Sequence, residues 1–226
     1  YEFIRYSGKP YICAESAVFR RNMPNYPAPQ AYHRFAWWSY FQDEGEYNVQ
    51  DCPSDRWERV KQEQDIEVKD WHTPGDAILL VLQRPGDSSL KNLLKKHGTY
   101  DAFLVHTLTE IRKNTDRKII VRLHPARVDR QMEIINRCSV TNFEISRNNA
   151  GAGLLNGGDG LYQDFKKAWA VVGFNTNALT ESVCEGIPTF SLCPSSMAWS
   201  VSNKSLDNLQ NPQTFERTQW LNNLAY

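Results

Sequence analysis

Residues 170–192 have the sequence AVVGFNTNALTESVCEGIPTFSL. The first five form an apolar run with the length of a buried strand, and the polar residues that follow predict a turn. Residues Asn177–Glu185 then fit a short helix, which Gly186 can terminate before Pro188 starts a second apolar run. This stretch predicts strand, turn, helix and strand, which is the repeating unit of a parallel α/β sheet.

The same alternation extends along the chain from Gly75 onward. Short apolar runs rich in β-branched residues predict five strands, at Ala77–Leu82, Lys118–Leu123, Asn142–Ile145, Ala170–Phe174 and Pro188–Leu192. Amphipathic stretches predict helices at Tyr100–Asn114, Asp129–Cys138, Leu161–Ala168, Asn177–Glu185 and from Gln213 to about Asn223. The predicted fold class is therefore α/β, a Rossmann-like parallel sheet with flanking helices over residues 75–226, ending in a C-terminal helix.

Residues 1–74 differ in composition from the rest of the chain. They are rich in aromatic residues, proline and charged residues, and their apolar residues show little periodicity. The chain begins at Tyr1 with a sequence typical of a domain interior, so we expect a partial, truncated N-terminal lobe with a leading segment missing. At its centre lies the aromatic block Tyr32–Phe41. These rings could stack on a sugar or a nucleobase, or they could pack between two domains, and the sequence leaves both alternatives open.

The composition is that of an ordinary globular protein, with 41% hydrophobic residues among 226. Lysine plus arginine (26) balance aspartate plus glutamate (26), so net charge neither favours nor excludes a nucleic-acid partner. No apolar run approaches the roughly 18 residues of a membrane span, and no signal sequence opens the chain. The cysteines lack the spacings of zinc or redox motifs and indicate reduced thiols. We therefore expect a cytoplasmic protein, in the host cytoplasm if it is viral.

Polar side chains follow four of the predicted strands at the point where each strand ends. Because ligands of open α/β sheets bind outside the carboxyl ends of the strands, we expect these groups to share one edge and to hold phosphates. The candidates are Arg84, Asp87, Ser88 and Ser89 after the first strand, His124 after the second, Asn175, Thr176 and Asn177 after the fourth, and Ser195 and Ser196 after the fifth. The glycine-rich residues 151–160 lack the lysine of a phosphate loop and are interpreted as a flexible connection.

The segment from Asn175 to Pro188 resembles the donor-binding motif of GT-B glycosyltransferases, in which an asparagine, a glutamate four residues later and Gly-x-Pro occur in this order. Here the asparagine is Asn177, the glutamate is Glu181 and the glycine is Gly186. The resemblance implies that Glu181 accepts hydrogen bonds from the ribose hydroxyls of a nucleotide sugar, while the polar turn lies against its phosphates. The plant-type string His-Cys-Gly-Trp does not precede Asn177, so the phosphate contact made by that string must come from elsewhere.

Two further stretches resemble the same superfamily. Residues 120–125, IVRLHP, are similar to the His-Pro motif of capsule-polysaccharide and sialyl-type transferases, which implies that His124 contacts the donor phosphate. Residues 83–89, QRPGDSS, are similar to a Gln-x-Pro-Gly-Asp-x-Ser string of capsule-synthesis-like and phage-encoded transferases, where a tight turn presents the aspartate and serines at the cleft. Together the resemblances cover about residues 75–200.

An inverting GT-B enzyme needs a group that takes the proton of the acceptor hydroxyl, and this group usually belongs to the N-terminal lobe. The catalytic candidates are Glu15, which follows a strand-like run, His33 and Asp43, with Glu44 as a further carboxylate. The chain lacks the Asp-x-Asp pair that holds manganese in GT-A enzymes. We therefore expect no metal, activity that survives chelation, and no cofactor beyond the nucleotide-sugar substrate.

The sequence thus predicts a metal-independent GT-B-type glycosyltransferase that moves a sugar from a nucleotide-sugar donor to a hydroxyl. The capsule-type resemblance implies a growing glycan as acceptor, whereas the phage-type resemblance implies a hydroxymethylated base of viral DNA. A nucleotide-sugar epimerase and a non-catalytic nucleotide-binding module are the alternatives, since the region before Gly75 is short for a second Rossmann-like lobe. The donor, the stereochemistry and the oligomeric state leave no recognisable pattern.

Overall fold

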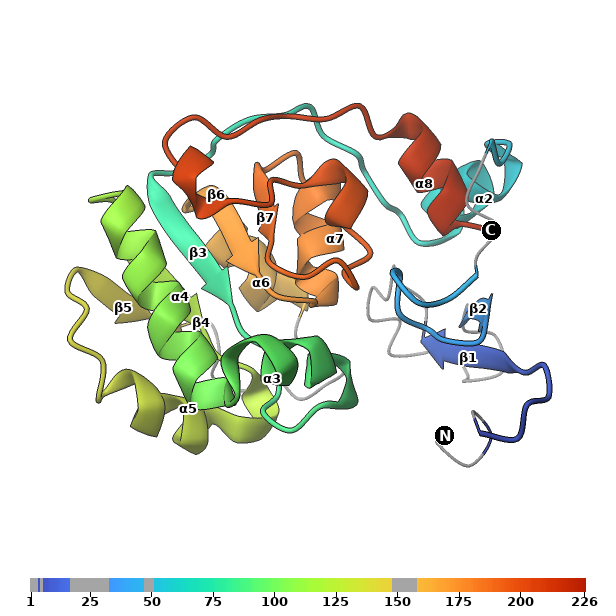
Figure 1. Ribbon diagram of the computed structural model, residues 1–226. Coiled ribbons are helices and arrows are strands. Elements are labelled where there is room, and N and C mark those ends of the chain that lie inside the picture. Colours follow the sequence, from blue (N-terminus) through green and yellow to red (C-terminus); the bar gives the residue numbers. More distant parts are fainter. Residues whose placement is uncertain (1–3, 5, 17–32, 47–50, 148–157) are drawn as a thin grey trace.

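A five-stranded parallel sheet forms the centre of the computed structural model, which describes residue 4 and residues 6–16, 33–46, 51–147 and 158–226 (Figure 1). Its strands are β3 (Ala77–Val81), β4 (Ile119–Arg122), β5 (Phe143–Ile145), β6 (Ala168–Gly173) and β7 (Thr189–Ser191). Their order is β5-β4-β3-β6-β7. The chain runs outward from β3 to β5, then crosses back to β6 beside β3 and runs outward again to β7. This Rossmann-like arrangement confirms the predicted fold class.

Helices cover both faces of the sheet (Figure 1). Successive residues of β3 point to opposite faces. Ile78 and Leu80 belong to the cluster formed with α3 (Lys91–His97), α4 (Tyr100–Asn114) and α5 (Val128–Ile135). Leu79 and Val81 belong to the cluster formed with α6 (Gly158–Phe165) and α7 (Asn177–Cys184). Burial on both faces explains why the strands are continuous apolar runs rather than alternating ones.

The last helix is shorter than predicted. α8 spans Thr218–Leu224, so the prediction of a helix from Gln213 is wrong. The reason is Asn203, whose Oδ1 accepts a hydrogen bond from Gln213 N–H at 3.0 Å and whose Nδ2 donates to the Gln213 carbonyl at 3.0 Å. With both backbone groups bound to one side chain, Gln213 cannot enter a helical ladder.

Other boundaries differ by less. α6 ends at Phe165 rather than at Ala168, because Ala168 already pairs with Ala77 in the sheet. α4 has the predicted bounds, and Thr99 caps it by accepting a hydrogen bond from Ala102 N–H at 3.1 Å. The sequence did not predict α3, nor the short 3-10 helices η2 (Ser88–Leu90), η3 (Pro125–Arg127), η5 (Trp199–Val201) and η6 (Leu206–Asn208).

The N-terminal region contributes two separate pieces. β1 (Ile12–Ser16) and β2 (His33–Trp37) form an antiparallel pair of their own. α2 (Asp55–Glu63), which the sequence did not predict, lies beside α8 (Figure 1). Trp57 and Val60 of α2 are buried in a cluster with Leu221 of α8. Residues far apart in the chain therefore form this second, small core.

Gly186 fixes how the chain enters the sheet. It ends α7, as predicted, with a φ of +72°. A Cβ atom at this position would lie 2.1 Å from the carbonyl oxygen of Asp70. His72 N–H also donates to the Gly186 carbonyl at 2.7 Å, so the segment before β3 lies directly against the end of α7. Only glycine allows both the left-handed backbone and this close approach.

Candidate functional site

The carboxyl ends of β3 and β6 lie side by side in the middle of the sheet, where the strand order reverses. In open α/β sheets this is the point at which ligands bind. The loops after β3, β4 and β6 carry most of the side chains predicted to contact a donor. Residues 82–89, 123–127 and 174–177 together are called the strand-end edge below.

Gln83 joins two of these loops. Its Oε1 accepts a hydrogen bond from Asn175 N–H at 2.8 Å, which links the end of β3 to the end of β6. Its Nε2 donates to Ser89 Oγ at 3.0 Å. The sequence offered Gln83 only as the first residue of the QRPGDSS string, and its bonding explains why a long amide is useful there.

Gln131, on α5, joins the third loop. Its side chain is fully buried. Oε1 accepts a hydrogen bond from His124 N–H at 2.8 Å, while Nε2 donates to the Gln83 carbonyl and to the Tyr100 hydroxyl, both at 2.8 Å. Burial raises the pKa of Tyr100, so its hydroxyl keeps the proton that it donates to the Gln83 carbonyl at 3.0 Å. Gln131 and Tyr100 were missed at the sequence level, because nothing distinguishes them from other residues of amphipathic helices.

Internal hydrogen bonds leave three donor hydrogens at the strand-end edge without an internal acceptor. Ser89 Oγ accepts from Gln83 Nε2, and Thr176 Oγ1 accepts from Ala178 N–H at 3.3 Å. His124 Nδ1 accepts from Ala126 N–H at 3.2 Å, so the neutral imidazole carries its hydrogen on Nε2. Within the described part of the chain, the two hydroxyl hydrogens and the Nε2 hydrogen donate to no protein group. Such a set suits an oxyanion.

His124 is neutral at pH 7. Burial lowers the pKa of its imidazole, the carboxylate of Asp87 raises it and the cation of Arg84 lowers it further, so the net shift is downward. A neutral ring donates through one nitrogen only, which makes the bond from Ala126 N–H decisive for the direction of donation.

No family model matches the sequence, and neither does any curated protein. Among solved structures, the chain is similar to Thermosulfurimonas dismutans KpsC, a beta Kdo 2,4 transferase. The TM-score is 0.59 at 13% sequence identity, and the match covers 100% of this chain and 74% of that one. The two proteins therefore share a fold.

The other predicted donor contacts of the β3 and β6 loops lie at the same edge. Asp87 accepts a hydrogen bond from Ser89 N–H at 2.8 Å and so caps η2. Arg84 and Ser88 are exposed, and Ser88 Oγ lies 2.9 Å from the Tyr40 hydroxyl. Asn177 is exposed in the first turn of α7.

Glu181 lies one turn after Asn177 on α7 and is half-buried. The hydroxyl of Tyr162, on α6, donates to its Oε2 at 3.1 Å. The carboxylate is therefore outside the apolar cluster beneath α6 and α7. The bond joins α6 to α7.

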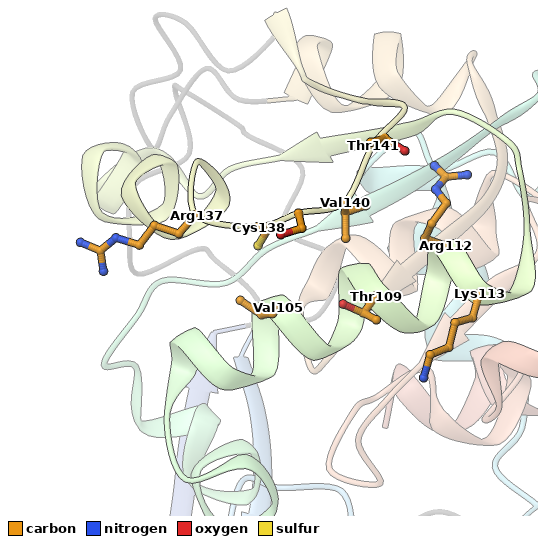
Figure 2. Close-up of a pocket in the computed structure, with 9 residues that line it drawn as sticks. Val105, Thr109, Arg112, Lys113, Arg137, Cys138, Val140 and Thr141 are labelled. Atoms are coloured by element: carbon orange, nitrogen blue, oxygen red, sulfur yellow. The ribbon is translucent and has the colours of Figure 1, made fainter.

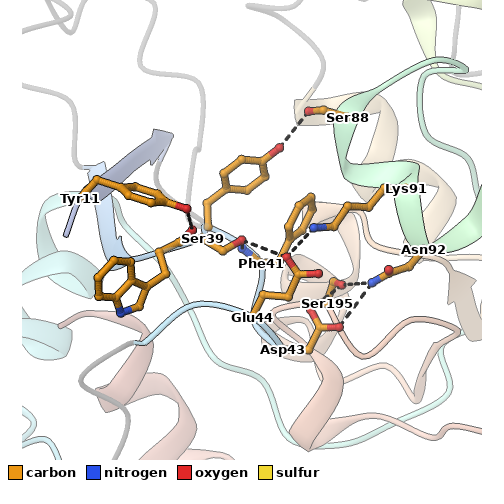
Figure 3. A network of polar contacts seen from close by, with 11 residues as sticks. Tyr11, Ser39, Phe41, Asp43, Glu44, Ser88, Lys91, Asn92 and Ser195 are labelled. Atoms are coloured by element: carbon orange, nitrogen blue, oxygen red, sulfur yellow. Dashed lines mark hydrogen bonds and ion pairs between the residues drawn. The ribbon is translucent and has the colours of Figure 1, made fainter. Parts of the chain in front are cut away.

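Ser195 and Ser196, predicted to contact the donor, are 3% and 1% exposed. Ser196 Oγ accepts from Ala198 N–H at 3.3 Å. Ser195 Oγ donates to Asp43 Oδ1 at 2.6 Å and accepts from Asn92 Nδ2 at 2.7 Å. Both side chains are thus buried inside the protein, and Ser195 instead connects the loop after β7 to the N-terminal region (Figure 3).

The loop of residues 39–46 docks on this side of the molecule (Figure 3). Glu44 forms an ion pair with Lys91 on α3, and the Lys91 ammonium lies 4.2 Å from the centre of the Phe41 ring. Asn92 Nδ2 also lies 3.3 Å from Asp43 Oδ2. Asp43 is therefore the catalytic candidate that the structure brings next to the loops of the sheet.

The other two catalytic candidates lie on the β1–β2 pair. Glu15 is opposite Arg34 in the register, and His33 is exposed at the start of β2. The aromatic block divides. Phe41 is buried at 3% exposure, whereas Phe35 and Trp37 are 61% and 45% exposed. Tyr32 lies outside the described residues, as do residues 151–157 of the glycine-rich stretch.

A buried ion pair beside the strand-end edge was also missed. Arg122, the last residue of β4, donates from Nη1 to Asp164 Oδ2 at 2.7 Å, and Ser146 Oγ donates to the same oxygen at 2.6 Å. The side chains of Arg122 and Asp164 are 13% and 1% exposed. The pair ties the ends of β4 and β5 to α6.

A cavity of about 530 Å³ lies elsewhere, between α4 and residues 137–141 (Figure 2). Residues 137–141 lead into the amino end of β5, so this cavity is remote from the strand-end edge. Among the described residues, no group of three His, Cys, Asp or Glu side chains could hold a metal ion. No helix within those residues is long and apolar enough to cross a membrane.

Proposed function

We propose that this chain is a GT-B-type glycosyltransferase whose strand-end edge holds the phosphates of a nucleotide-sugar donor. The observation that carries the proposal is the set of N–H and O–H groups on Ser89, His124 and Thr176 that have no acceptor within the described protein. They come from three neighbouring strand ends at the switch point. The likeness to a Kdo transferase supports the same class of reaction.

Each predicted donor contact takes a role in this proposal. Ser88, Ser89, His124, Asn175, Thr176 and Asn177 surround the phosphates, with Arg84 supplying positive charge and Asp87 holding the loop. Glu181 accepts hydrogen bonds from the ribose hydroxyls. Ser195 and Ser196 act through the position of their loop, since both side chains are buried. Residues 75–226 form the donor-binding domain, and residues 1–74 belong to the acceptor side.

Asp43 is the proposed general base. It accepts hydrogen bonds from Ser195 and Asn92, one on each carboxylate oxygen, which fixes its orientation. A carboxylate has about four lone-pair sites, so either oxygen can still take the proton of an acceptor hydroxyl. Glu15 and His33 are the alternatives, and Asp43→Asn compared with Glu15→Gln and His33→Gln separates them by the rate of transfer.

The first experiment is a thermal-shift screen of the protein with UDP, CMP, GDP and dTDP compounds, because a bound ligand raises the melting temperature. The nucleotide that binds is then titrated into Glu181→Ala. Loss of hydrogen bonds to a charged group costs about 1.5–3 kcal/mol, or roughly 10- to 100-fold in affinity. Glu110→Ala, which removes a half-buried glutamate on α4, is the matched control and should bind as the wild type does. Equal affinity of Glu181→Ala and wild type contradicts the role of Glu181.

Product analysis then separates the reaction classes. A transferase releases free nucleotide in the presence of an acceptor, an epimerase interconverts donors without release, and a binding module does neither. A capsule-type glycan and DNA containing hydroxymethylated bases are the two acceptors to compare. Transfer should persist in EDTA, since N–H and O–H groups of the protein and helix N-termini stabilise the leaving phosphate in this proposal. All five cysteines are free thiols, which supports a cytoplasmic location.

A further inference from the structure

We infer that Gln131 is a positioning residue, which holds His124 so that its imidazole donates outward to an anionic ligand. The inference rests on the proposed function for the identity of that ligand. Gln131 itself touches no ligand and acts through His124.

The orientation of the Gln131 amide is unambiguous. Its oxygen accepts from a backbone N–H, that of His124, and its nitrogen donates to a backbone carbonyl, that of Gln83. Exchanging the oxygen and nitrogen would place donor against donor and acceptor against acceptor. A fully buried amide with every partner in place is rigid, because breaking any of these bonds leaves a desolvated polar group.

Gln131 bonds the backbone of His124 and influences the imidazole ring indirectly. Gln131 holds the N–H of His124, and His124 Nδ1 in turn accepts from Ala126 N–H at the first turn of η3. Fixing the backbone of His124 at the start of η3 therefore fixes the acceptor role of Nδ1. The hydrogen must then be on Nε2, which is the nitrogen available to a ligand.

Packing alone does not require an amide at this position. A methionine has nearly the same length and could fill the same volume. The three hydrogen bonds, in contrast, join α5 to the loops after β3 and β4 and to α4. The polar residue therefore serves the alignment of the strand-end edge.

The first test observes His124 directly and needs no ligand. Nitrogen-15 NMR of the imidazoles in the wild type should show a single tautomer with the hydrogen on Nε2. In Gln131→Met, His124 should become a mixture of tautomers, and its pKa should rise towards the ordinary value, with Asp87 and Arg84 as the charged groups that face it. Unchanged signals of His97 and His106 on α3 and α4 establish that the variant is folded.

A second variant, Gln131→Glu, tests the same inference if Gln131→Met does not fold. Gln131→Glu keeps an oxygen that can accept from His124 N–H and should retain the Nε2 tautomer, although it loses the donations to Gln83 and Tyr100. A folded Gln131→Met, or a Gln131→Glu, that gives the opposite tautomer result overturns the inference.

The second test measures coupling, with inorganic pyrophosphate as the probe in titration calorimetry. His124→Ala should weaken binding about tenfold in the wild type, the usual size of one lost hydrogen bond to a charged group. In the Gln131→Met background the same change should weaken binding less than twofold. Full additivity of the two substitutions overturns the inference. If pyrophosphate and every nucleotide fail to bind the wild type while Gln131→Met alters the tautomer, the proposed function fails and the positioning of His124 by Gln131 stands.

Discussion

The sheet with its helices and the loop of residues 39–46 are held in place by different physics. The strands of the sheet are buried on both faces, and Ile78, Leu79 and Leu80 have no exposed surface. The loop attaches mainly through polar contacts: Tyr40 is hydrogen-bonded to Ser88, Asp43 accepts from Ser195, and Glu44 pairs with Lys91. Phe41 is its one buried apolar side chain. Apolar burial is worth far more free energy than polar contacts near the surface. The sheet is therefore the rigid part of the site, whereas the loop that carries the proposed base is the weakly held part.

The largest loss of unfolding free energy is expected at Gly186, where the backbone leaves no room for a side chain. Gly186→Ala combines a left-handed φ with a Cβ placed 2.1 Å from a carbonyl oxygen, so we expect destabilisation of more than about 3 kcal/mol in urea unfolding. Gly98→Ala is the matched control. Its φ is +73° with no atom within 4 Å of the added Cβ, so only backbone strain remains and the cost should be smaller. Equal costs would mean that the contact with Asp70 does not constrain the fold.

A cavity beside the sheet should cause the next largest loss of unfolding free energy. Leu80→Ala removes a fully buried side chain between β3 and the α3–α5 layer, and we expect a loss of about 2–5 kcal/mol of unfolding free energy. Leu94→Ala, on α3 at 47% exposure, should change it much less. Thermal unfolding of the two variants side by side tests whether the sheet dominates stability.

The loop should respond weakly to a change of its own. Glu44→Gln removes the ion pair with Lys91, whose two side chains are 27% and 29% exposed, and should cost only about 0.5–1 kcal/mol. The cost should shrink further at high salt. A loss as large as that of Leu80→Ala would contradict the difference between the two regions. The measurement is urea unfolding at low and high ionic strength.

The smallest change in stability is expected at acidic pH, where His124 takes up a proton. Because burial lowers the pKa of His124 in the folded state, the unfolded chain binds its proton first as pH falls below about 6.5. The stability of the wild type should therefore decline, relative to His124→Gln, as pH falls from that value towards the folded pKa. Urea midpoints of both proteins between pH 8 and pH 5 measure this, and His97, whose pKa burial also lowers, is common to both. Parallel curves would show that His124 is not buried from solvent.

Local pattern was enough to predict the five strands, because strands buried on both faces must be apolar along their whole length. It was also enough to place the polar turns at strand ends, since the carboxyl ends of parallel strands share one edge. Local pattern failed where a partner lies far along the chain. Ser195 looked like an outward serine, yet it bonds Asp43, 152 residues away. Gln131 looked like an ordinary polar position of a helix, although it contacts Gln83 across 48 residues.

The contact between α2 and α8 has a consequence for how the chain is made. Cys52 and Asn223 are hydrogen-bonded across 171 residues, and the neighbouring Trp57 packs on Leu221 in the same cluster. At about 5–20 residues per second, a ribosome needs on the order of 10–30 s to synthesise the intervening chain. For that time the apolar face of α2 lacks its partners on α8, so chaperones can bind this face during translation.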